Sequence, residues 1–415
     1  MPGGVDDPAA PSGGNRYDRR VCGELPRAGW PVHEHAVPGT WPDPAPEARA
    51  ELARILAESA DGSVVLLDGL VACAAPDVVV PEAARLRLAV LVHLPLADET
   101  GLTPERAAEL DAAERRTLHA VSAVIATSTW AANRLITHHD LPRTRVHVAP
   151  PGTDRAPLSR GTDRSGPAGT TPGADAHHSP PRAPGTDAGT DPGTDAGTDP
   201  GTDAGTALIT APGTDRSPAP APRAPLLLCV ATVSPRKGQL RLVEALAEVA
   251  QLDWRCVLAG GLGQDPGYVA QVRERIHAAG LGARIRLAGP RVGPALAATY
   301  AQADLLVLAS HAETYGMAVT EALARGIPVL ATAVGGVPEA LGQAPDGTLP
   351  GVLVPPDDPA ALTAALRAWL AEPGERRRSR EAAYQRRTTL AGWDTTARSL
   401  AEVLERLPHE PRRTA

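Results

Sequence analysis

The chain has 415 residues, 43% of them hydrophobic, and a formal net charge of −7 at pH 7. This length gives room for two domains of ordinary size, and the acidic balance, without any basic run, excludes nucleic acid as an expected partner. No apolar run reaches the roughly 18 residues of a membrane span and no signal peptide precedes the first domain, so we expect a cytoplasmic protein.

Two amino acids are used in a way that bears on the chemistry. The four cysteines (Cys22, Cys73, Cys229 and Cys256) are scattered without a CxxC pair, so we expect buried, reduced thiols. Lysine occurs once, at Lys237, in a chain that otherwise uses arginine.

The pattern of apolar runs and helix signals in residues 1–154 predicts an α/β domain. A Gly/Pro-rich start leads to a helix over 17–25 and a strand over 31–37. In a doubly wound domain a strand precedes the first glycine turn, here Gly13-Gly14, but only 1–5 are available. We therefore expect the first strand to be missing or reduced. The further elements expected here are helices over 47–59, 104–120 and 130–138, and strands over 63–68, 88–93, 123–127 and 145–149.

Residues 155–222 differ in composition from the rest. The tripeptide Gly-Thr-Asp occurs eight times between Gly152 and Asp215, separated by Pro and Ala, with almost no apolar content. Nothing there can offset the entropy of ordering the chain, so we predict a disordered insertion between two domains. A calcium-binding repeat is the alternative, although the aspartates lack the Gly-Asp spacing of such sites.

Residues 223–385 predict a second α/β domain, and 386–415 a final helix and tail. The strands expected from apolar runs are 225–230, 255–259, 284–288, 305–308, 327–332 and 351–354. The helices expected are 239–250, 268–279, 317–324, one that opens after Gly335-Gly336, and then 359–371, 376–388 and 395–407.

A basic pair, Arg236-Lys237, stands just before the helix over 239–250. Backbone N–H groups and the dipole at a helix N-terminus favour an anion, and Lys237 adds a point charge, so this is a candidate phosphate site. A solvated basic turn is the alternative.

Two carboxylates, Glu313 and Glu321, are separated by seven residues around the start of the helix over 317–324. Glu313 lies in the loop after the strand over 305–308, at the edge where open α/β sheets bind ligands. An ionised carboxylate only accepts hydrogen bonds, so two of them suit a ligand rich in hydroxyls. Capping or solvation of a surface helix is the alternative.

The stretch from Glu313 through Thr-Tyr-Gly-Met-Ala-Val-Thr to Glu321, continued by Gly335-Gly336-Val-Pro-Glu339, resembles the E-x7-E motif of retaining glycosyltransferases of family 4. This resemblance implies the GT-B fold: α/β, with two Rossmann-like domains that face a central cleft. It also implies that 386–415 carries a helix crossing back to the first domain, and that residues 150–154, Pro-Pro-Gly-Thr-Asp, form the crossing to the second.

The resemblance also implies roles for individual residues. Glu313 would hold the hydroxyls of a donor hexose and Glu321 the ribose, while His93, after the strand over 88–93, would lie on the opposite wall near the sugar. Catalysis would rest on Glu313, His93 and Lys237. The donor-binding residues implied are Arg236, Lys237, Gly238, Gly261, Arg291, Val292, Glu313, Tyr315, Gly316, Met317 and Glu321. Gly13, Gly14 and Asn15 match the family's turn that faces the donor phosphates and the acceptor.

One departure from the family pattern concerns the phosphate loop. Ala231-Thr232 stands where the family usually has Gly-Arg, so we expect Arg236 to compensate.

The function implied is transfer of a hexose from a nucleotide-diphosphate sugar to an acceptor hydroxyl, with retention and without a protein nucleophile. The chain has no Asp-x-Asp triplet, so no divalent metal or other cofactor is expected. The acceptor is a small molecule, a glycan or a lipid, and peripheral contact with a membrane stays open. The alternatives are an epimerase or phosphorylase of the same fold, or a degenerate sugar-nucleotide binder. The sequence leaves the sugar, the base, the acceptor and the oligomeric state open.

Overall fold

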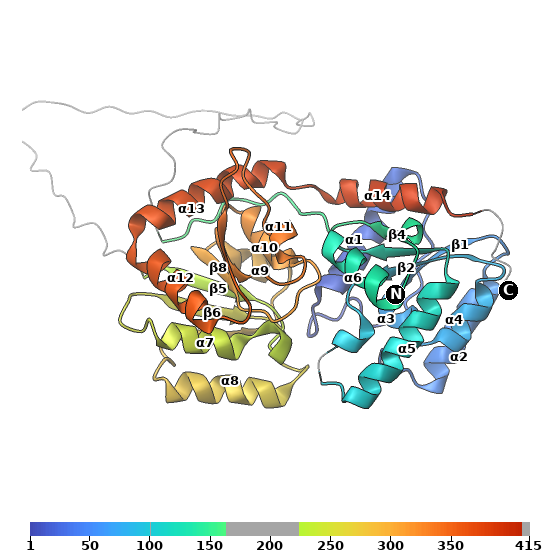
Figure 1. Cartoon of the computed structure of the whole chain (residues 1–415), viewed down its shortest axis with the longest axis horizontal. Coiled ribbons are helices and arrows are strands. Elements are labelled where there is room, and N and C mark those ends of the chain that lie inside the picture. Colours follow the sequence, from blue (N-terminus) through green and yellow to red (C-terminus); the bar gives the residue numbers. More distant parts are fainter. Residues whose placement is uncertain (100, 163–223, 409–415) are drawn as a thin grey trace, which may run out of the picture. The chain divides into compact units, whose positions relative to one another are not determined.

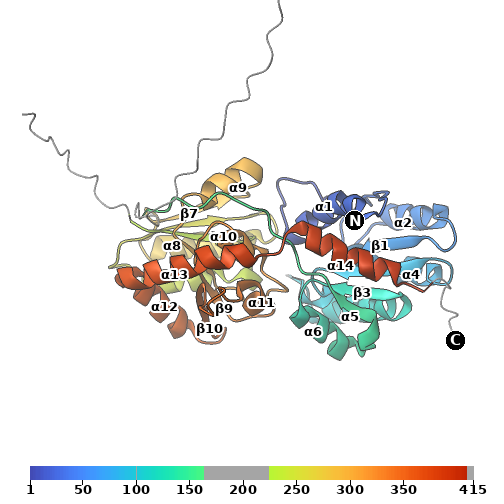
Figure 2. The same ribbon diagram turned by 90° about the horizontal axis from the view of Figure 1, so that it is seen from above.

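A computed structural model describes residues 1–99, 101–162 and 224–408. Two sheets flanked by helices organise these residues (Figures 1 and 2). The first has the strand order β1-β2-β3-β4 and the second β10-β9-β8-β5-β6-β7, and neighbouring strands are parallel in both. We call residues 1–154 the first half and 224–408 the second half.

The strands and helices follow the sequence closely. The strands are β1 (Val64–Asp68), β2 (Arg87–Val92), β3 (Ala123–Ala126), β4 (Val146–Val148), β5 (Leu226–Val230), β6 (Arg255–Ala259), β7 (Ile285–Gly289), β8 (Leu305–Leu308), β9 (Val329–Thr332) and β10 (Gly351–Val354). The helices of the first half are α1 (Gly13–Glu24), α2 (Pro46–Glu58), α3 (Gly69–Ala72), α4 (Pro76–Glu82), α5 (Pro104–Ala120) and α6 (Thr129–His139). Those of the second half are α7 (Gln239–Ala247), α8 (Pro266–Ala278), α9 (Gly293–Tyr300), α10 (Met317–Leu323), α11 (Val337–Leu341), α12 (Pro359–Ala371), α13 (Pro373–Arg386) and α14 (Trp393–Glu405). Short 3-10 turns are η1 (Leu25–Ala28), η2 (Leu96–Asp98), η3 (Arg143–Arg145), η4 (Pro235–Lys237) and η5 (Arg387–Thr389).

Successive side chains of a strand point to opposite faces of a sheet, and both faces of the first sheet are buried. Leu88 and Val90 of β2 pack in a core with α2, α4, α5 and α6. Their neighbours Ala89 and Leu91 point the other way, into a core with α1 and α14. Both faces of an all-parallel sheet are covered in this way, which explains why its strands read as continuous apolar runs.

The helix α14 belongs to the second of these cores, although in sequence it is the last helix of the second half. The Trp393 ring meets the Tyr17 ring of α1 edge-on at 5.6 Å between centroids. Thr396 Oγ1 donates to Pro150 O at 2.8 Å. α1 and α14 therefore lie side by side on one face of the first sheet (Figures 1 and 2).

The second sheet has the doubly wound order. Read from β7, its strands run third, second, first, fourth, fifth, sixth in sequence, and the direction of winding reverses between β5 and β8. Buried side chains from both faces of this sheet belong to one hydrophobic cluster. Ligands of such folds bind at the carboxyl ends of the two strands where the winding reverses.

The segment that follows the first half is packed rather than free at its start. Ser159 N donates to Arg325 O at 2.9 Å, and Thr162 N donates to Asp304 Oδ1 at 2.7 Å. Residues 155–162 of the predicted insertion thus lie against the second half, because buried Asp304 provides an acceptor at the start of β8. Residues 163–222 of that prediction lie outside the described residues.

Two further expectations need correction. The predicted strand over 31–37 is absent from the described residues, which show only an isolated bridge between Pro2 and Val37. The segment 13–15, expected as a turn before the helix, is the first turn of α1 itself, because Ser12 caps the helix by accepting from Asn15 N.

The cysteines agree with the expectation from their spacing. All four are free, and Cys73, Cys229 and Cys256 are buried while Cys22 is partly exposed. Among the residues described, no helix has the length and apolar character that a membrane crossing requires.

Candidate active site

Lys237 and Glu313 meet where the winding of the second sheet reverses. The turn η4, in the loop after β5, carries Lys237, and the loop after β8 carries Glu313. Lys237 Nζ lies 2.6 Å from Glu313 Oε1. The cation predicted for phosphate and the carboxylate predicted for sugar hydroxyls therefore share one site, at the edge where this fold binds ligands.

Glu313 is held there as a carboxylate. It is only 8% exposed, and the same oxygen also accepts from Ser310 Oγ at 2.9 Å. Burial raises the pKa of Glu313, but the charges of Lys237 and Arg236 and the two hydrogen bonds outweigh burial, so the net pKa is below the ordinary value. Burial also lowers the pKa of Lys237, against the opposing charge of Glu313. The two side chains thus form a largely buried ion pair, with that of Lys237 15% exposed and that of Glu313 10% exposed.

Backbone contacts fix the loop of Lys237 against the loop of Glu313. His311 N donates to Arg236 O at 2.8 Å, and Arg236 Nη1 lies 3.4 Å from Ala312 O. Gly238 adopts a left-handed φ of 66°, and a Cβ there would lie 2.0 Å from Ala309 O. Only glycine allows this approach.

The glycine turn after β9 supports Glu313 from the other side. Gly336 N donates to Glu313 O at 3.0 Å. Gly335 has a φ of 53°, and a Cβ on it would lie 1.7 Å from that same carbonyl oxygen. The match of Gly335-Gly336 to the family pattern therefore has a local reason, since this turn packs directly on the backbone of Glu313.

Glu321 lies on α10, and both of its carboxylate oxygens have partners. Tyr300 Oη donates to Oε2 at 3.0 Å, and the Arg16 guanidinium of α1 is ion-paired with Oε1. Arg16 also lies 3.1 Å from Asp154 Oδ2. The second glutamate of the motif thus joins α10 to the first half.

Three of these residues, Arg16, Tyr300 and Asp154, were not predicted from the sequence. Two of them lie next to segments that were predicted to be functional, since Arg16 follows Gly13-Gly14-Asn15 and Asp154 ends the Pro-Pro-Gly-Thr-Asp crossing. Tyr300 stood near no selected motif.

The loop of Glu313 also touches the N-terminus of α6. Ser128 Oγ donates to Thr314 O at 2.5 Å. Glu339, in the first turn of α11, accepts from Thr129 N at 2.9 Å. A carboxylate at a helix N-terminus interacts favourably with the free N–H groups and the dipole, so these contacts tie the E-x7-E loop to the first half.

His93 follows β2 and lies in a buried cluster with two aspartates. Its Nε2 is 2.8 Å from Asp18 Oδ1 and 3.5 Å from Asp68 Oδ2. Burial lowers the pKa of His93, but the two carboxylates outweigh burial and raise it above the ordinary value. Burial and the charge of Asp18 raise the pKa of Asp68 to about 7. The three groups lie within 4.8 Å of one another, a spacing that could hold a divalent metal.

The glycines at the start of α1 lie between His93 and the E-x7-E segment. A Cβ on Gly14 would lie 3.1 Å from His93 Cδ2, and one on Gly13 would lie 3.3 Å from Met317 Sδ. Asn15 points elsewhere, because its Nδ2 donates to Gly4 O at 3.4 Å. The structure thus brings Gly13 and Gly14 together with His93 and Met317, from opposite halves of the chain.

The other predicted donor residues lie around the same edge of the second sheet. Gly261 follows β6, accepts from Val233 N at 2.9 Å and faces Thr232, whose Cγ2 would lie 3.8 Å from a Cβ there. Gly316, with a φ of 96°, caps α10 beside Tyr315, whose pKa burial raises to about 12.

Arg291 and Val292 lie farther along, at the start of α9. Val292 is the N-cap residue of that helix and is 44% exposed. Their predicted contact with the nucleotide base stays a prediction.

Two family models match separate parts of the chain. Residues 51–156 match the model described as Glycosyltransferase Family 4, and residues 214–386 match the model described as Glycosyl transferases group 1. The first match includes all four strands of the first sheet, and the second runs from before β5 to the end of α13.

Curated relatives share part of the sequence. The D-inositol 3-phosphate glycosyltransferase of Kineococcus radiotolerans is 34% identical over 194 residues, 44% of this chain and 44% of that protein. The protein of the same name from Xylanimonas cellulosilytica is 35% identical over 181 residues, 43% of this chain and 42% of that protein. These alignments span less than half the length of each relative.

Solved structures share the fold along almost the whole chain. Sucrose-phosphate synthase from Thermosynechococcus elongatus has a TM-score of 0.65 at 21% identity, covering 97% of both chains. Anabaena Alr3699/HepE in complex with UDP and glucose has a TM-score of 0.65 at 16% identity, covering 96% of this chain and 97% of that one. The chain thus has the GT-B fold of these structures, and two of its segments match family models of glycosyltransferases, one of them described as family 4.

Proposed function

We propose that this protein is a retaining glycosyltransferase that moves a hexose from a nucleotide-diphosphate sugar to an acceptor hydroxyl without a metal ion. The observation that carries the proposal is the 2.6 Å contact between Lys237 and Glu313 where β5 and β8 meet. This contact supports the proposal because Lys237 is a cation that could hold a diphosphate, while Glu313 is a carboxylate that could accept hydrogen bonds from sugar hydroxyls.

The donor would lie across the carboxyl edge of the second sheet. Lys237 and the backbone N–H groups at the start of α7 would hold the diphosphate, apart from the N–H of Leu240, which already donates to Tyr268 Oη at 3.0 Å. Glu313 would accept from the hexose hydroxyls. Glu321 would accept from the ribose. Because Glu321 Oε1 is ion-paired with Arg16, the ribose would have to share this oxygen with Arg16 or displace Arg16 from it.

The reaction forms a bond between the acceptor oxygen and the anomeric carbon and breaks the bond between that carbon and the diphosphate oxygen. Both events occur on one face of the sugar, so the configuration is retained. The proton of the acceptor hydroxyl passes to the departing diphosphate oxygen. Lys237 stabilises the charge that develops on the diphosphate, and His93, held by Asp18 and Asp68, would contact the sugar from the first half.

The relatives suggest which ligands to try first. Structures of Alr3699/HepE contain UDP and glucose, or UDP-glucose, so UDP-glucose is the first donor to test. Relatives are named for D-inositol 3-phosphate, so that compound is the first acceptor to test. A cytoplasmic location and peripheral contact with a membrane stay predictions.

A thermal-shift panel of UDP-, GDP- and ADP-sugars identifies the donor, because a ligand that binds only the folded state raises its melting temperature. A labelled form of that donor is then incubated with acceptors, using wild type and Glu313→Ala. We expect labelled product from wild type and a loss of about a hundredfold or more from the variant, the scale of removing one electrostatic contact to the transition state. Equal rates in the two proteins would remove the catalytic role and leave a sugar-nucleotide binder.

Metal independence has its own test. The cluster of Asp18, Asp68 and His93 is where a metal could enter the site. We expect transfer to continue at an unchanged rate after dialysis against EDTA. A loss that added Mg²⁺ or Mn²⁺ restores would contradict this part of the proposal.

A further inference from the structure

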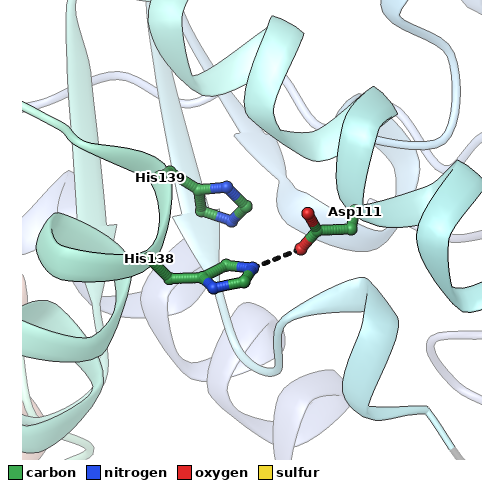
Figure 3. A group of neighbouring side chains, drawn as sticks. All are labelled: Asp111, His138 and His139. Carbon is green, nitrogen blue, oxygen red and sulfur yellow. Dashed lines mark hydrogen bonds and ion pairs between the residues drawn. The ribbon is translucent and has the colours of Figure 1, made fainter.

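A second cluster of metal-ligating side chains lies in the first half and contains none of the residues discussed above. Asp111 comes from α5, and His138 and His139 are the last two residues of α6. One ring nitrogen of each histidine and one oxygen of Asp111 lie within 4.8 Å of one another. Figure 3 shows the two rings and the carboxylate gathered between the two helices, with His138 Nε2 2.5 Å from Asp111 Oδ1.

A pocket makes the cluster accessible. Its volume is about 250 Å³, and its lining includes Asp111, His138 and His139. Arg134 also lines this pocket, and a cation there would oppose a metal ion. However, Arg134 Nη2 lies 2.7 and 2.9 Å from the two carboxylate oxygens of Asp98, so its charge is already matched.

His139 has the support that metal-binding histidines usually have. It is fully buried, and its Nε2 lies 3.1 Å from Oε2 of buried Glu114. The tautomer that donates from Nε2 to this carboxylate keeps a lone pair on Nδ1, which has no hydrogen-bond partner among the described residues. A carboxylate bonded to one ring nitrogen fixes the tautomer and raises the basicity of the histidine.

We propose that Asp111, His138 and His139 bind a divalent metal ion, and that Zn²⁺ fits this donor set best. Zn²⁺ takes imidazole nitrogen and carboxylate oxygen, and open zinc sites use three protein ligands with water at the fourth position. Zinc–nitrogen bonds of about 2.0–2.1 Å place tetrahedral ligands roughly 3.4 Å apart. The three groups lie within 4.8 Å of one another, which exceeds that spacing by at most about 1.4 Å (4.8 − 3.4).

The test is calorimetric titration of the full chain with Zn²⁺ alone, after removal of metals with a chelator. His138 and Asp111 are replaced singly by alanine, since their side chains are 49% and 33% exposed and contribute little to the core. Two other pairs of histidines serve as controls: His33 and His35, which are exposed, and His177 and His178, which lie outside the described residues. Each control pair is replaced by alanine in a separate variant.

We expect wild type and both control variants to bind one equivalent of Zn²⁺ with equal affinity, and His138→Ala and Asp111→Ala to bind at least about tenfold more weakly. Unchanged affinity in these two variants, or loss of the binding in a control variant instead, would overturn the proposal. Co²⁺ gives a second readout, because its tetrahedral complexes absorb visible light strongly. That absorption should appear in wild type and be lost in His138→Ala, whose melting temperature without metal reports that it is folded.

Discussion

Arg16 of α1 is ion-paired with Glu321 of α10, 305 positions later in the sequence. The pair ties the glycine-rich start of the first half to the second glutamate of the E-x7-E motif. Glu321 is the residue that the family resemblance assigns to the ribose of the donor. The carboxylate oxygen predicted for a ligand is thus already occupied by a side chain of the same protein.

Replacing Arg16 should therefore change nucleotide affinity. If Arg16 and the ribose compete for Glu321, Arg16→Ala binds the nucleotide more tightly. The gain is limited to about fivefold, because a partly exposed ion pair is worth at most about 1 kcal/mol. Calorimetric titration with the nucleotide measures it, and Arg19→Ala, which removes an ion pair of the same helix with Asp6 and Glu34, is the control. Weaker binding in Arg16→Ala alone would show instead that Arg16 contacts the ligand.

The buried pair of Lys237 and Glu313 should show strong energetic coupling. Lys237→Met leaves a buried carboxylate and Glu313→Gln leaves a buried ammonium, so each single change should cost about 3–5 kcal/mol of unfolding free energy. The double variant leaves no unpaired charge and should cost clearly less than the sum. Urea unfolding of the four proteins measures the coupling, and strict additivity would contradict the contact.

Gly238 and Gly280 form a matched pair for testing how the phosphate loop packs. Both have a left-handed backbone, with φ of 66° and 68°. A Cβ on Gly280 meets nothing within 4 Å, whereas one on Gly238 would lie 2.0 Å from Ala309 O. We expect Gly280→Ala to lose about 1–2 kcal/mol of unfolding free energy from backbone strain alone, and Gly238→Ala to lose distinctly more. Equal losses would mean that the loop does not approach Ala309 as described.

The sequence predicted the elements of both sheets well wherever local signals were complete. The helix expected over 104–120 is α5 without any change in its ends, because Thr103 caps it and Pro104 begins it. α4 (Pro76–Glu82) was missed, since Pro81 within it is a helix-breaking signal. The expected strand over 31–37 pairs with no strand in the described part of the chain and makes only the single bridge between Pro2 and Val37.

The candidate site was also predictable only where local sequence signals were complete. Lys237 and Glu313 stand out because each follows a buried strand, and the strand order of the fold then brings them together. The residues that hold Glu321 and His93 come from α1 and from the ends of distant elements. Arg16 and Asp18 were not predicted, because their roles depend on where α1 packs in the folded chain and not on a local sequence pattern.

The cluster around His93 predicts a dependence of stability on pH. The pKa of Asp68 is raised to about 7 by burial and Asp18, above the value of about 3.9 in an unfolded chain. The folded state therefore keeps a proton that the unfolded state releases. This contribution is complete below pH ~3.9 and is lost as the pH rises to about 7, and the raised pKa of His93 acts in the same direction at higher pH.

Asp68→Asn isolates this effect, because an amide oxygen can still accept the Leu70 N–H at the start of α3. We expect the free energy of unfolding of wild type, relative to the variant, to fall between pH 4 and 7. The fall is at most about 4 kcal/mol at roughly 1.4 kcal/mol per pKa unit. Asp358→Asn, the same replacement at the exposed cap of α12, is the control for the change of side chain itself. A difference that grows with pH would have the wrong sign.

The central claim is that the Lys237–Glu313 site binds the diphosphate of a nucleotide sugar. Calorimetric titration of wild type and Lys237→Ala with the nucleotide sugar that gives the largest thermal shift tests it most directly. Hydrogen bonds to charged groups contribute about 1.5–3 kcal/mol, so the account predicts roughly ten- to hundredfold weaker binding in the variant. Equal affinity in the two proteins would contradict it.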